Sequence, residues 1–495
     1  MNNPTIALVS ISRWSKFPAC PDVPNTMRTR LLLVISTLLF GASSIFAVPV
    51  SFQANDDTIT TTLVRGPYTL ANLTDNDTSS GGPVFILAAS KPEHGNAEVR
   101  PGNVVVYTTS HSFRGTDAFT YTIGSDLNGI GAISQASVTI RNPYYLYRGT
   151  YNSAIAGIHQ IHSESGYLTL TVDPLGSFSA KVFFAGQAYP FKAEFDAEGR
   201  YTANIQRAAP LPSLRLDMQF HLEGEPGIDC NLTIGAQLTT FVAQYNTWSS
   251  LNRPPLEGKY TITLPAPDTR STTPQGSGYG VLVISRSGTA TFRGRTGDNR
   301  SYSASSILGV DNTVPFYSAL YDGTGSIFGD VVFNEVTTGS VLVNASLIWT
   351  KQRKPKDKLF PKGFIRTVAA HGSNYIEPTS NTCVLDVGET ENFNSNFTVT
   401  TGVLQKTRTE RALLANRPDV GIYAVTFDNT KHLQASLKVS PSDGVFRGTF
   451  FNAITQKYYK MSGVFVQGEN AAYGLWNSST KAGFVLLQPD SLSAN

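Results

Sequence analysis

Hydrophobic and polar residues alternate along most of the chain, in short runs that end at turns rich in glycine, asparagine and aspartate. In the clearest run, residues 118–123, Phe119, Tyr121 and Ile123 occupy every second position. Successive side chains of a strand point to opposite faces, so this run predicts a strand with one apolar face, entered through a turn at residues 115–117. Helical periodicity is weak, and residues 410–416 are the one short helical candidate. We therefore predict an all-β protein.

A glycine pattern repeats three times after residue 142. Gly-x-Tyr triplets at residues 149–151, 258–260 and 421–423 each open an alternating run, followed by hairpin patterns at residues 168–180, 281–294 and 437–448. Each hairpin has a central glycine, which can take the positive φ that tight turns require. The repetition predicts three β-meander units, residues 143–255, 256–380 and 381–495, each long enough for a small barrel or a stack of sheets.

Residues 48–142 have short alternating runs with turn signals every 8–12 residues, which predicts an immunoglobulin-like β-sandwich. The motifs are A-N-D-D at 54–57, N-D at 76–77, P-E-H-G at 92–95, F-R-G-T-D-A-F-T-Y at 113–121 and S-Q-A-S-V-T-I at 134–140. In this order they resemble the bacterial cadherin-like Ig domains, which occur in surface and secreted proteins. The resemblance implies a spacer or adhesion module and no catalysis. The middle meander unit resembles uncharacterised repeats of large exported bacterial proteins, and this likeness implies no activity.

The N-terminal region has the three-part layout of a secretory signal peptide. A basic start at residues 27–30 precedes a ten-residue apolar run at 31–40 and a small-residue region at 41–47, with a cleavage point after Ala47. Residues 27–47 are therefore expected to be a signal peptide, and residues 1–26 a non-native extension. The apolar run is shorter than the roughly 20 residues that span a bilayer. We expect a secreted or cell-surface protein with no transmembrane segment after cleavage.

Composition narrows the set of partners. Only 15% of the residues are charged and the net charge is +3, which does not favour a nucleic-acid partner. Of the three cysteines, Cys20 is removed with the leader. Cys230 and Cys383 can pair in an exported protein, or they can be two buried thiols in separate domains; the sequence leaves both alternatives open.

The sequence predicts no catalytic residue. The run Gly276-Ser277-Gly278-Tyr279-Gly280 has its serine one place too early for the Gly-x-Ser-x-Gly nucleophile elbow, and it is better explained as a turn leading into a strand. His159 and His162 would lie on opposite faces of a strand, which does not favour a shared metal, although a loop site with Glu164 is conceivable.

The acidic residues Asp56, Asp57, Asp75 and Asp77 are the candidate ligands for calcium, which prefers carboxylate and amide oxygens. The alternative is that these residues form Asx turns. A basic run from Lys351 to Lys362 can bind an anionic glycan or be a solvated loop, of which the loop is favoured.

These patterns predict a secreted or cell-surface, non-enzymatic binding or structural protein of an adhesion-like kind, with no required cofactor. Its partner would be an extracellular polysaccharide or a surface protein. The alternative is a secreted carbohydrate-active enzyme or its accessory carbohydrate-binding subunit. A cleft holding two close carboxylates and aromatic residues would favour the enzyme. Barrels whose interiors are filled by side chains would favour the binding or structural protein.

Overall fold

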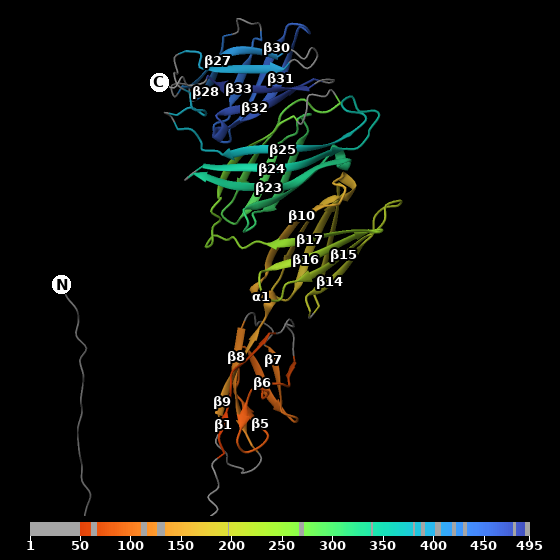
Figure 1. Ribbon diagram of the computed structural model, residues 1–495, viewed down its shortest axis with the longest axis vertical. Helices are drawn as coiled ribbons and strands as arrows, with labels where there is room; N and C mark the ends of the chain where they lie inside the picture. Colours follow the sequence, from red (N-terminus) through yellow and green to blue (C-terminus); the bar gives the residue numbers. More distant parts are fainter. Residues whose placement is uncertain are drawn as a thin grey trace, which may run out of the picture. The chain divides into compact units, whose positions relative to one another are not determined.

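The computed structural model describes residues 50–60, 67–109, 116–125, 134–196, 198–266, 272–337, 340–379, 382–387, 392–400, 407–417, 422–428, 433–478 and 482–490 (Figure 1). The chain divides into residues 1–49 and a compact unit from Val50 to Asn495. The expected signal peptide, residues 27–47, and the extension before it lie outside the described residues. Within the described part, no helix is long and apolar enough to cross a membrane.

The first domain is a β-sandwich, as predicted. Its strands are β1 (Phe52–Gln53), β2 (Asp57–Thr60), β3 (Tyr68–Leu70), β4 (Thr78–Ser79), β5 (Phe85–Ala89), β6 (Gly95–Arg100), β7 (Val104–Thr109), β8 (Thr116–Gly124) and β9 (Ser134–Arg141). They form a four-stranded sheet in the order β2-β9-β8-β5, a three-stranded sheet β3-β7-β6 and the short pair β1-β4. Strands β2 and β9 run parallel, and the other pairs are antiparallel.

The alternating run at the centre of this domain has the predicted orientation. Phe119, Tyr121 and Ile123 of β8 are all at most 3% exposed, and they pack with Val105 and Tyr107 of β7. Apolar side chains from both sheets therefore meet in one core, and this packing stabilises the domain without a disulfide.

The first meander begins after a short helix, α1 (Pro143–Leu146), which Asn142 caps by accepting a hydrogen bond from the Tyr145 amide. Its strands are β10 (Gly149–Ala156), β11 (Ser165–Val172), β12 (Ser177–Phe184), β13 (Gln187–Glu194), β14 (Arg200–Ile205), β15 (Leu214–Phe220), β16 (Gly227–Ile234) and β17 (Gln237–Tyr245), with the 3₁₀ turn η2 (His162–Glu164). The sheet order is β13-β12-β11-β10-β17-β16-β15-β14, so the first and last strands pair and β13 and β14 are the edges.

The second meander repeats this arrangement. Its strands are β18 (Gly258–Leu264), β19 (Gly278–Ile284), β20 (Thr289–Arg295), β21 (Ser301–Ile307), β22 (Thr313–Leu320), β23 (Gly325–Thr337), β24 (Ser340–Lys351) and β25 (Phe364–Asn374), with the 3₁₀ turn η3 (Tyr321–Gly323). The order is β21-β20-β19-β18-β25-β24-β23-β22, in which β18 pairs with β25.

The last eight strands form a closed barrel in sequence order. They are β26 (Ser395–Thr400), β27 (Thr407–Arg417), β28 (Ile422–Phe427), β29 (Ser436–Val439), β30 (Val445–Asn452), β31 (Lys457–Val466), β32 (Ala471–Asn477) and β33 (Ala482–Pro489), with the 3₁₀ turn η4 (Gln467–Glu469). Pairing of β26 with β33 closes the barrel. The all-β prediction is confirmed.

Residues 410–416, the one short helical candidate in the sequence, form part of strand β27. The segment contains alanine and leucine, which favour helices, but β26 and β28 pair with it on its two sides. Ladder hydrogen bonds and core packing on a flanked strand outweigh the weak local preference.

The three predicted hairpin glycines all take positive φ. The angles are +83° at Gly176, +75° at Gly288 and +67° at Gly444, so this prediction is confirmed. The carbonyl of each glycine accepts a hydrogen bond from a backbone amide about two strands further along the chain. These amides belong to Phe195, Leu308 and Phe465. The three hairpins are therefore equivalent parts of the three units.

An aromatic side chain from the segment before each unit's hairpin packs on that glycine. Tyr144 contacts Gly176, Trp248 contacts Gly288 and Tyr375 contacts Gly444, and a Cβ atom on any of the three glycines would collide with the ring. Each ring also donates a hydrogen bond to a carbonyl of the unit it covers, from Tyr144 to Asp196 (2.8 Å), Trp248 to Leu308 (2.8 Å) and Tyr375 to Pro441 (2.5 Å).

The closed barrel uses the same arrangement with a shifted starting point. In the two meanders the glycine hairpin joins the second and third strands, β11 to β12 and β19 to β20. In the barrel it joins the fourth and fifth, β29 to β30. The barrel therefore has two more strands before its glycine hairpin than each meander has, as in a circular permutation.

We expect Gly176→Ala to destabilise the first meander more than Gly235→Ala. Both glycines have positive φ, which costs an L-residue about 1–2 kcal/mol, but a Cβ atom at Gly235 meets nothing within 4 Å. At Gly176 the added methyl group would lie 2.9 Å from the Tyr144 ring, and such overpacking costs a further ~1–3 kcal/mol. Calorimetry of the two variants tests this, and equal losses would show that the ring contact contributes nothing.

Candidate functional site

The interiors of the three units are filled by their own side chains. Phe220 in the first meander, Phe316 in the second and Trp476 in the barrel are each at most 2% exposed and belong to the respective cores. Large side chains pack the described cores of the two eight-stranded sheets and of the closed barrel. Binding would therefore involve the outer faces and the junctions.

A groove of about 1120 Å³ lies along β28–β32 of the closed barrel. Tyr279 of β19, Arg295 at the end of β20 and Asn299 in the following turn line its second wall. The groove therefore combines segments that are more than a hundred residues apart in sequence.

Two polar contacts join the walls of the groove. The Arg293 guanidinium forms an ion pair with Asp443 (Nη2–Oδ2, 2.9 Å), and the Asn299 amide donates to the Asn477 side chain (2.9 Å). The Lys259 ammonium also donates to the Ser442 carbonyl. The hairpin between β29 and β30 is thus fixed to the second meander.

An apolar cluster lies beside the groove. Tyr279 packs there against Val464, Val466 and Leu475, all of which are at most 5% exposed. These residues bury apolar area between the second meander and the outer face of the barrel. The contact excludes water and gives the groove a rigid base.

The outer face of the groove carries basic side chains. Lys438 of β29 lies directly opposite Arg447 of β30, and Lys460 of β31 lies opposite Thr449 in the neighbouring row. All three basic side chains are exposed, and all three line the groove. Among the described lining residues Asp443 is the one carboxylate, and Arg293 already binds it.

Sequence reasoning missed this groove, although one signal was present. The glycine-rich run at residues 276–280 leads into β19, as expected, but it is also the place where the second meander approaches the barrel. A Cβ atom at Gly276 would lie 2.7 Å from the Leu475 side chain, so glycine permits a close approach there. The sequence does not show which surface approaches this run.

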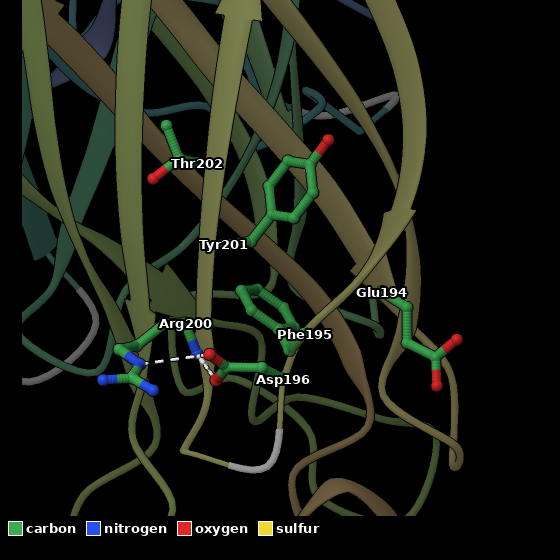
Figure 2. A pocket seen from close by; sticks show the side chains of 6 residues that line it. All are labelled: Glu194, Phe195, Asp196, Arg200, Tyr201 and Thr202. Atoms are coloured by element: carbon green, nitrogen blue, oxygen red, sulfur yellow. Dashed lines mark hydrogen bonds and ion pairs between the residues drawn. The ribbon is translucent and has the colours of Figure 1, made fainter.

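A second hollow, of about 630 Å³, lies at the edges β13 and β14 of the first meander, and it holds the two carboxylates Glu194 and Asp196 beside Phe195 and Tyr201 (Figure 2). This composition resembles the cleft expected of a glycosidase, so its geometry bears on the enzyme alternative. Figure 2 shows the Glu194 carboxylate pointing away from Asp196.

Asp196 is held by a turn. Its Oδ1 accepts hydrogen bonds from the amides of Glu198 (3.1 Å) and Arg200 (2.7 Å), and its Oδ2 accepts from the Arg200 guanidinium (3.1 Å). Burial raises the pKa of Asp196, but the hydrogen bonds from Arg200 outweigh it and keep the pKa below its ordinary value. A glycosidase general acid needs a raised pKa, so the lowered pKa of Asp196 does not suit that role.

Of the four acidic residues proposed for calcium, the structure brings Asp57 and Asp77 together at one hydroxyl group. Asp57 and Asp77 both lie 2.9 Å from the Tyr121 hydroxyl, whereas Asp56 and Asp75 are exposed. Asp77 Oδ1 also accepts a hydrogen bond from the Asn55 amide (2.8 Å). Within the described residues, no group of three or more His, Cys, Asp or Glu side chains could hold a metal ion. The described contacts of Asp57 and Asp77 are long-range hydrogen bonds to Tyr121 and Asn55, and they tie distant segments of the sandwich together.

Residues of the motifs at 113–121 also form buried hydrogen bonds between core strands and loops. Asp117, from the G-T-D run, accepts hydrogen bonds from the Tyr107 hydroxyl (2.7 Å) and the His94 amide (3.2 Å). Tyr121, from the F-T-Y run, also lies 2.6 Å from the Leu73 carbonyl. These buried polar groups fix loops of the sandwich to its core strands.

The two histidines near residue 160 do not share a site. The His159 ring binds Glu164 (Nδ1–Oε1, 2.8 Å), and Gln237 donates to the same oxygen (3.2 Å). His162 is buried and points instead to Ser326 and Gly323 of the second meander, both at 3.0 Å. The conceivable metal site at His159, His162 and Glu164 is not formed.

The Cys230–Cys383 disulfide is not present. Cys230 is a free thiol in the core of the first meander, and burial raises its pKa to about 12. Cys383 is partly exposed and lies in the segment before the closed barrel. The two residues belong to different units, as in the second alternative, but only Cys230 is buried.

The basic run mixes buried and exposed charges. Lys351 ends β24 and is buried, where its ammonium binds Asp357 (2.7 Å) and the Phe360 carbonyl (3.1 Å). Arg353, Lys356, Lys358 and Lys362 are exposed in the loop to β25. This arrangement agrees with a solvated loop.

Comparison with known families identifies the first domain. Residues 47–141 match a family described as a bacterial Ig domain. The match agrees with the sandwich topology, and the first domain is Ig-like. Bacterial Ig domains are typical of extracellular surface and structural proteins. A search of curated proteins found no match to the chain.

We expect Asp57→Asn to raise the melting temperature of the Ig-like domain at pH 7 by about 2–4 °C. Burial and the neighbouring Asp77 charge raise the pKa of Asp57, although the Tyr121 hydrogen bond opposes this. Because the folded pKa is raised, wild-type stability falls as the pH rises through the interval between the ordinary and the raised pKa.

The asparagine variant should therefore gain stability at pH 7 and gain nothing at pH 3, where Asp57 is protonated. Asp75→Asn, at an exposed position whose charge is not among the causes of the Asp57 shift, is the control and should leave the transition unchanged. An identical gain at both pH values would contradict the electrostatic explanation.

Proposed function

We propose that this chain is a secreted or cell-surface, non-enzymatic binding and structural protein of an adhesion-like kind, exported with cleavage after Ala47. The observation that carries the proposal is the buried junction between successive units. Each unit has a filled interior, and side chains of one unit are buried against the next. Such an array holds its outer surfaces in fixed positions, which suits recognition by surface groups on a rigid scaffold.

The junction between the two meanders is both polar and apolar. Ser326 of β23 lies within hydrogen-bond distance of His162 (3.0 Å) and Ser165 (3.1 Å) of the first meander. Burial lowers the pKa of His162, so the ring is neutral at pH 7 and its nitrogens are used in these contacts. Beside this network lies an apolar cluster that comprises Tyr167, Tyr317, Phe328 and Ile348.

The junction between the second meander and the barrel contains a His–Glu–Tyr group. His371 of β25 binds Glu469 of η4, and the Tyr473 hydroxyl donates to the same carboxylate (2.8 Å). Burial raises the pKa of Glu469, but the His371 and Tyr473 hydrogen bonds outweigh it and lower the pKa overall. The Gly468 amide also donates to Ser373 (2.8 Å). These contacts support a fixed junction.

The second candidate function, a carbohydrate-active enzyme, rests on the hollow at Glu194 and Asp196. The turn that holds Asp196 and the outward direction of Glu194 favour the binding protein over this alternative. An accessory carbohydrate-binding role differs from our proposal only in its partner.

The test uses residues 27–495 expressed in a bacterium, with the exported protein collected. Its intact mass should correspond to a chain beginning at Val48. We then expect retention on immobilised polysaccharides without release of soluble sugar, whether or not calcium is present. Release of sugar that disappears in Glu194→Gln would contradict the proposal and support the enzyme. Retention that requires calcium would contradict our assignment of Asp57 and Asp77 to a structural contact.

A further inference from the structure

We propose that the groove along β28–β32 binds an acidic polysaccharide through Lys438, Arg447 and Lys460. This inference deepens the proposed binding function and depends on it. The groove is defined by its lining residues, which come from the closed barrel and from Tyr279, Arg295 and Asn299 of the second meander.

The basic side chains of the groove repel one another. Lys438 and Arg447 are direct cross-strand partners, and like charges placed opposite each other destabilise a sheet. Within the described part of the chain, neither forms an ion pair, and neither does Lys460. Asp443, the one acidic lining residue described, is bound to Arg293. An anionic ligand would remove this repulsion, because it supplies the negative charge that the groove lacks.

The spacing of the basic groups also bears on the ligand. Neighbouring strands are about 4.8 Å apart, and residues two positions apart along a strand are separated by about 6.6 Å. Lys438 and Arg447 occupy one cross-strand row, and Lys460 lies two positions along and one strand further. The three positive charges therefore follow a diagonal across the strands. Such a line fits several charges of an extended polymer better than one small anion.

The chemistry of the groups between the charges narrows the choice of ligand. Hydroxyl groups of Ser436 and Thr449, which lie 3.0 Å apart, and of Ser462 line the same groove. The partly exposed, apolar Val445 lies beside them. Sugar rings present both hydroxyl groups and apolar C–H faces, whereas a polyphosphate chain presents neither. The combination therefore favours an acidic polysaccharide over polyphosphate.

The rigidity of the base adds to the expected affinity. The groove lies on paired strands, and its hairpin is fixed by Arg293 and Lys259 of the second meander. A preformed site loses less conformational entropy on binding than a flexible loop does. The exposed basic loop at residues 353–362 carries a similar charge without such a base.

The test compares two charge-matched triple variants of the exported protein. The groove variant is Lys438→Gln, Arg447→Gln, Lys460→Gln, and the loop variant is Lys354→Gln, Lys356→Gln, Lys358→Gln. Both lose three positive charges, so non-specific attraction falls equally in both. The probes are polygalacturonate, a neutral glucan and polyphosphate, and binding is measured by calorimetric titration at low and high salt.

We expect wild-type protein to bind polygalacturonate, with weaker binding at high salt, and to bind the neutral glucan poorly. The groove variant should bind polygalacturonate about tenfold more weakly, because it loses three partly screened ionic contacts, while the loop variant should bind like wild type. Melting curves of both variants check that each is folded, and we expect no loss of stability because none of the six side chains belongs to a core.

Other results would overturn the inference. Equal affinity of the groove variant and wild type, stronger loss in the loop variant, equal binding of the neutral glucan, tighter binding of polyphosphate, or no binding of polygalacturonate would each do so. None of these outcomes alone contradicts the proposed binding and structural function. Release of soluble sugar would contradict that function, but the affinities of the groove and loop variants could still be compared.

Discussion

The contact between an aromatic ring and a hairpin glycine is the constraint on which the succession of units depends. Tyr144, Trp248 and Tyr375 each cover a glycine with positive φ, and each also donates a hydrogen bond to the unit it covers. A larger residue in place of the glycine would need both an unfavourable backbone angle and the space that the ring occupies. Because the rings belong to segments outside the hairpins, the contact fixes the chain that connects successive units to the unit that follows.

At the third contact this constraint reaches the candidate binding site. Tyr375 directly follows β25, and its ring covers Gly444 in the hairpin that leads into β30. The same hairpin contains Asp443, which lines the groove and binds Arg293 of the second meander. The side chains that form the structural contact are therefore next to those that form the groove. The packing at this hairpin therefore supports both the junction between the units and the proposed binding surface.

The sequence predicts features whose cause is local. Alternation places Phe119 and Tyr121 in the core, and glycine in a turn pattern predicts the positive φ at Gly176 and its two equivalents. Features that arise from tertiary contact were not predictable. Residues 410–416 have a helical composition, yet neighbouring strands determine their conformation. The groove joins Tyr279 to Lys438, and no local pattern shows that their strands come together. The acidic residues have a composition that suits calcium, but no local pattern shows that Asp57 and Asp77 both lie beside the Tyr121 hydroxyl.

The most direct test of the account is hydrogen exchange in wild type, Tyr375→Phe and Tyr375→Ala. The Phe465 amide donates to the Gly444 carbonyl (2.8 Å), and the Leu414 amide, elsewhere in the barrel, donates to Asn394 (3.0 Å). If the ring fixes the hairpin, the Phe465 amide should exchange faster in Tyr375→Ala than in wild type, while exchange at the Leu414 amide stays the same. In Tyr375→Phe, the Phe465 amide should keep most of its protection. Unchanged exchange at Phe465, or equal acceleration at both amides, would contradict the claim that this contact fixes the groove.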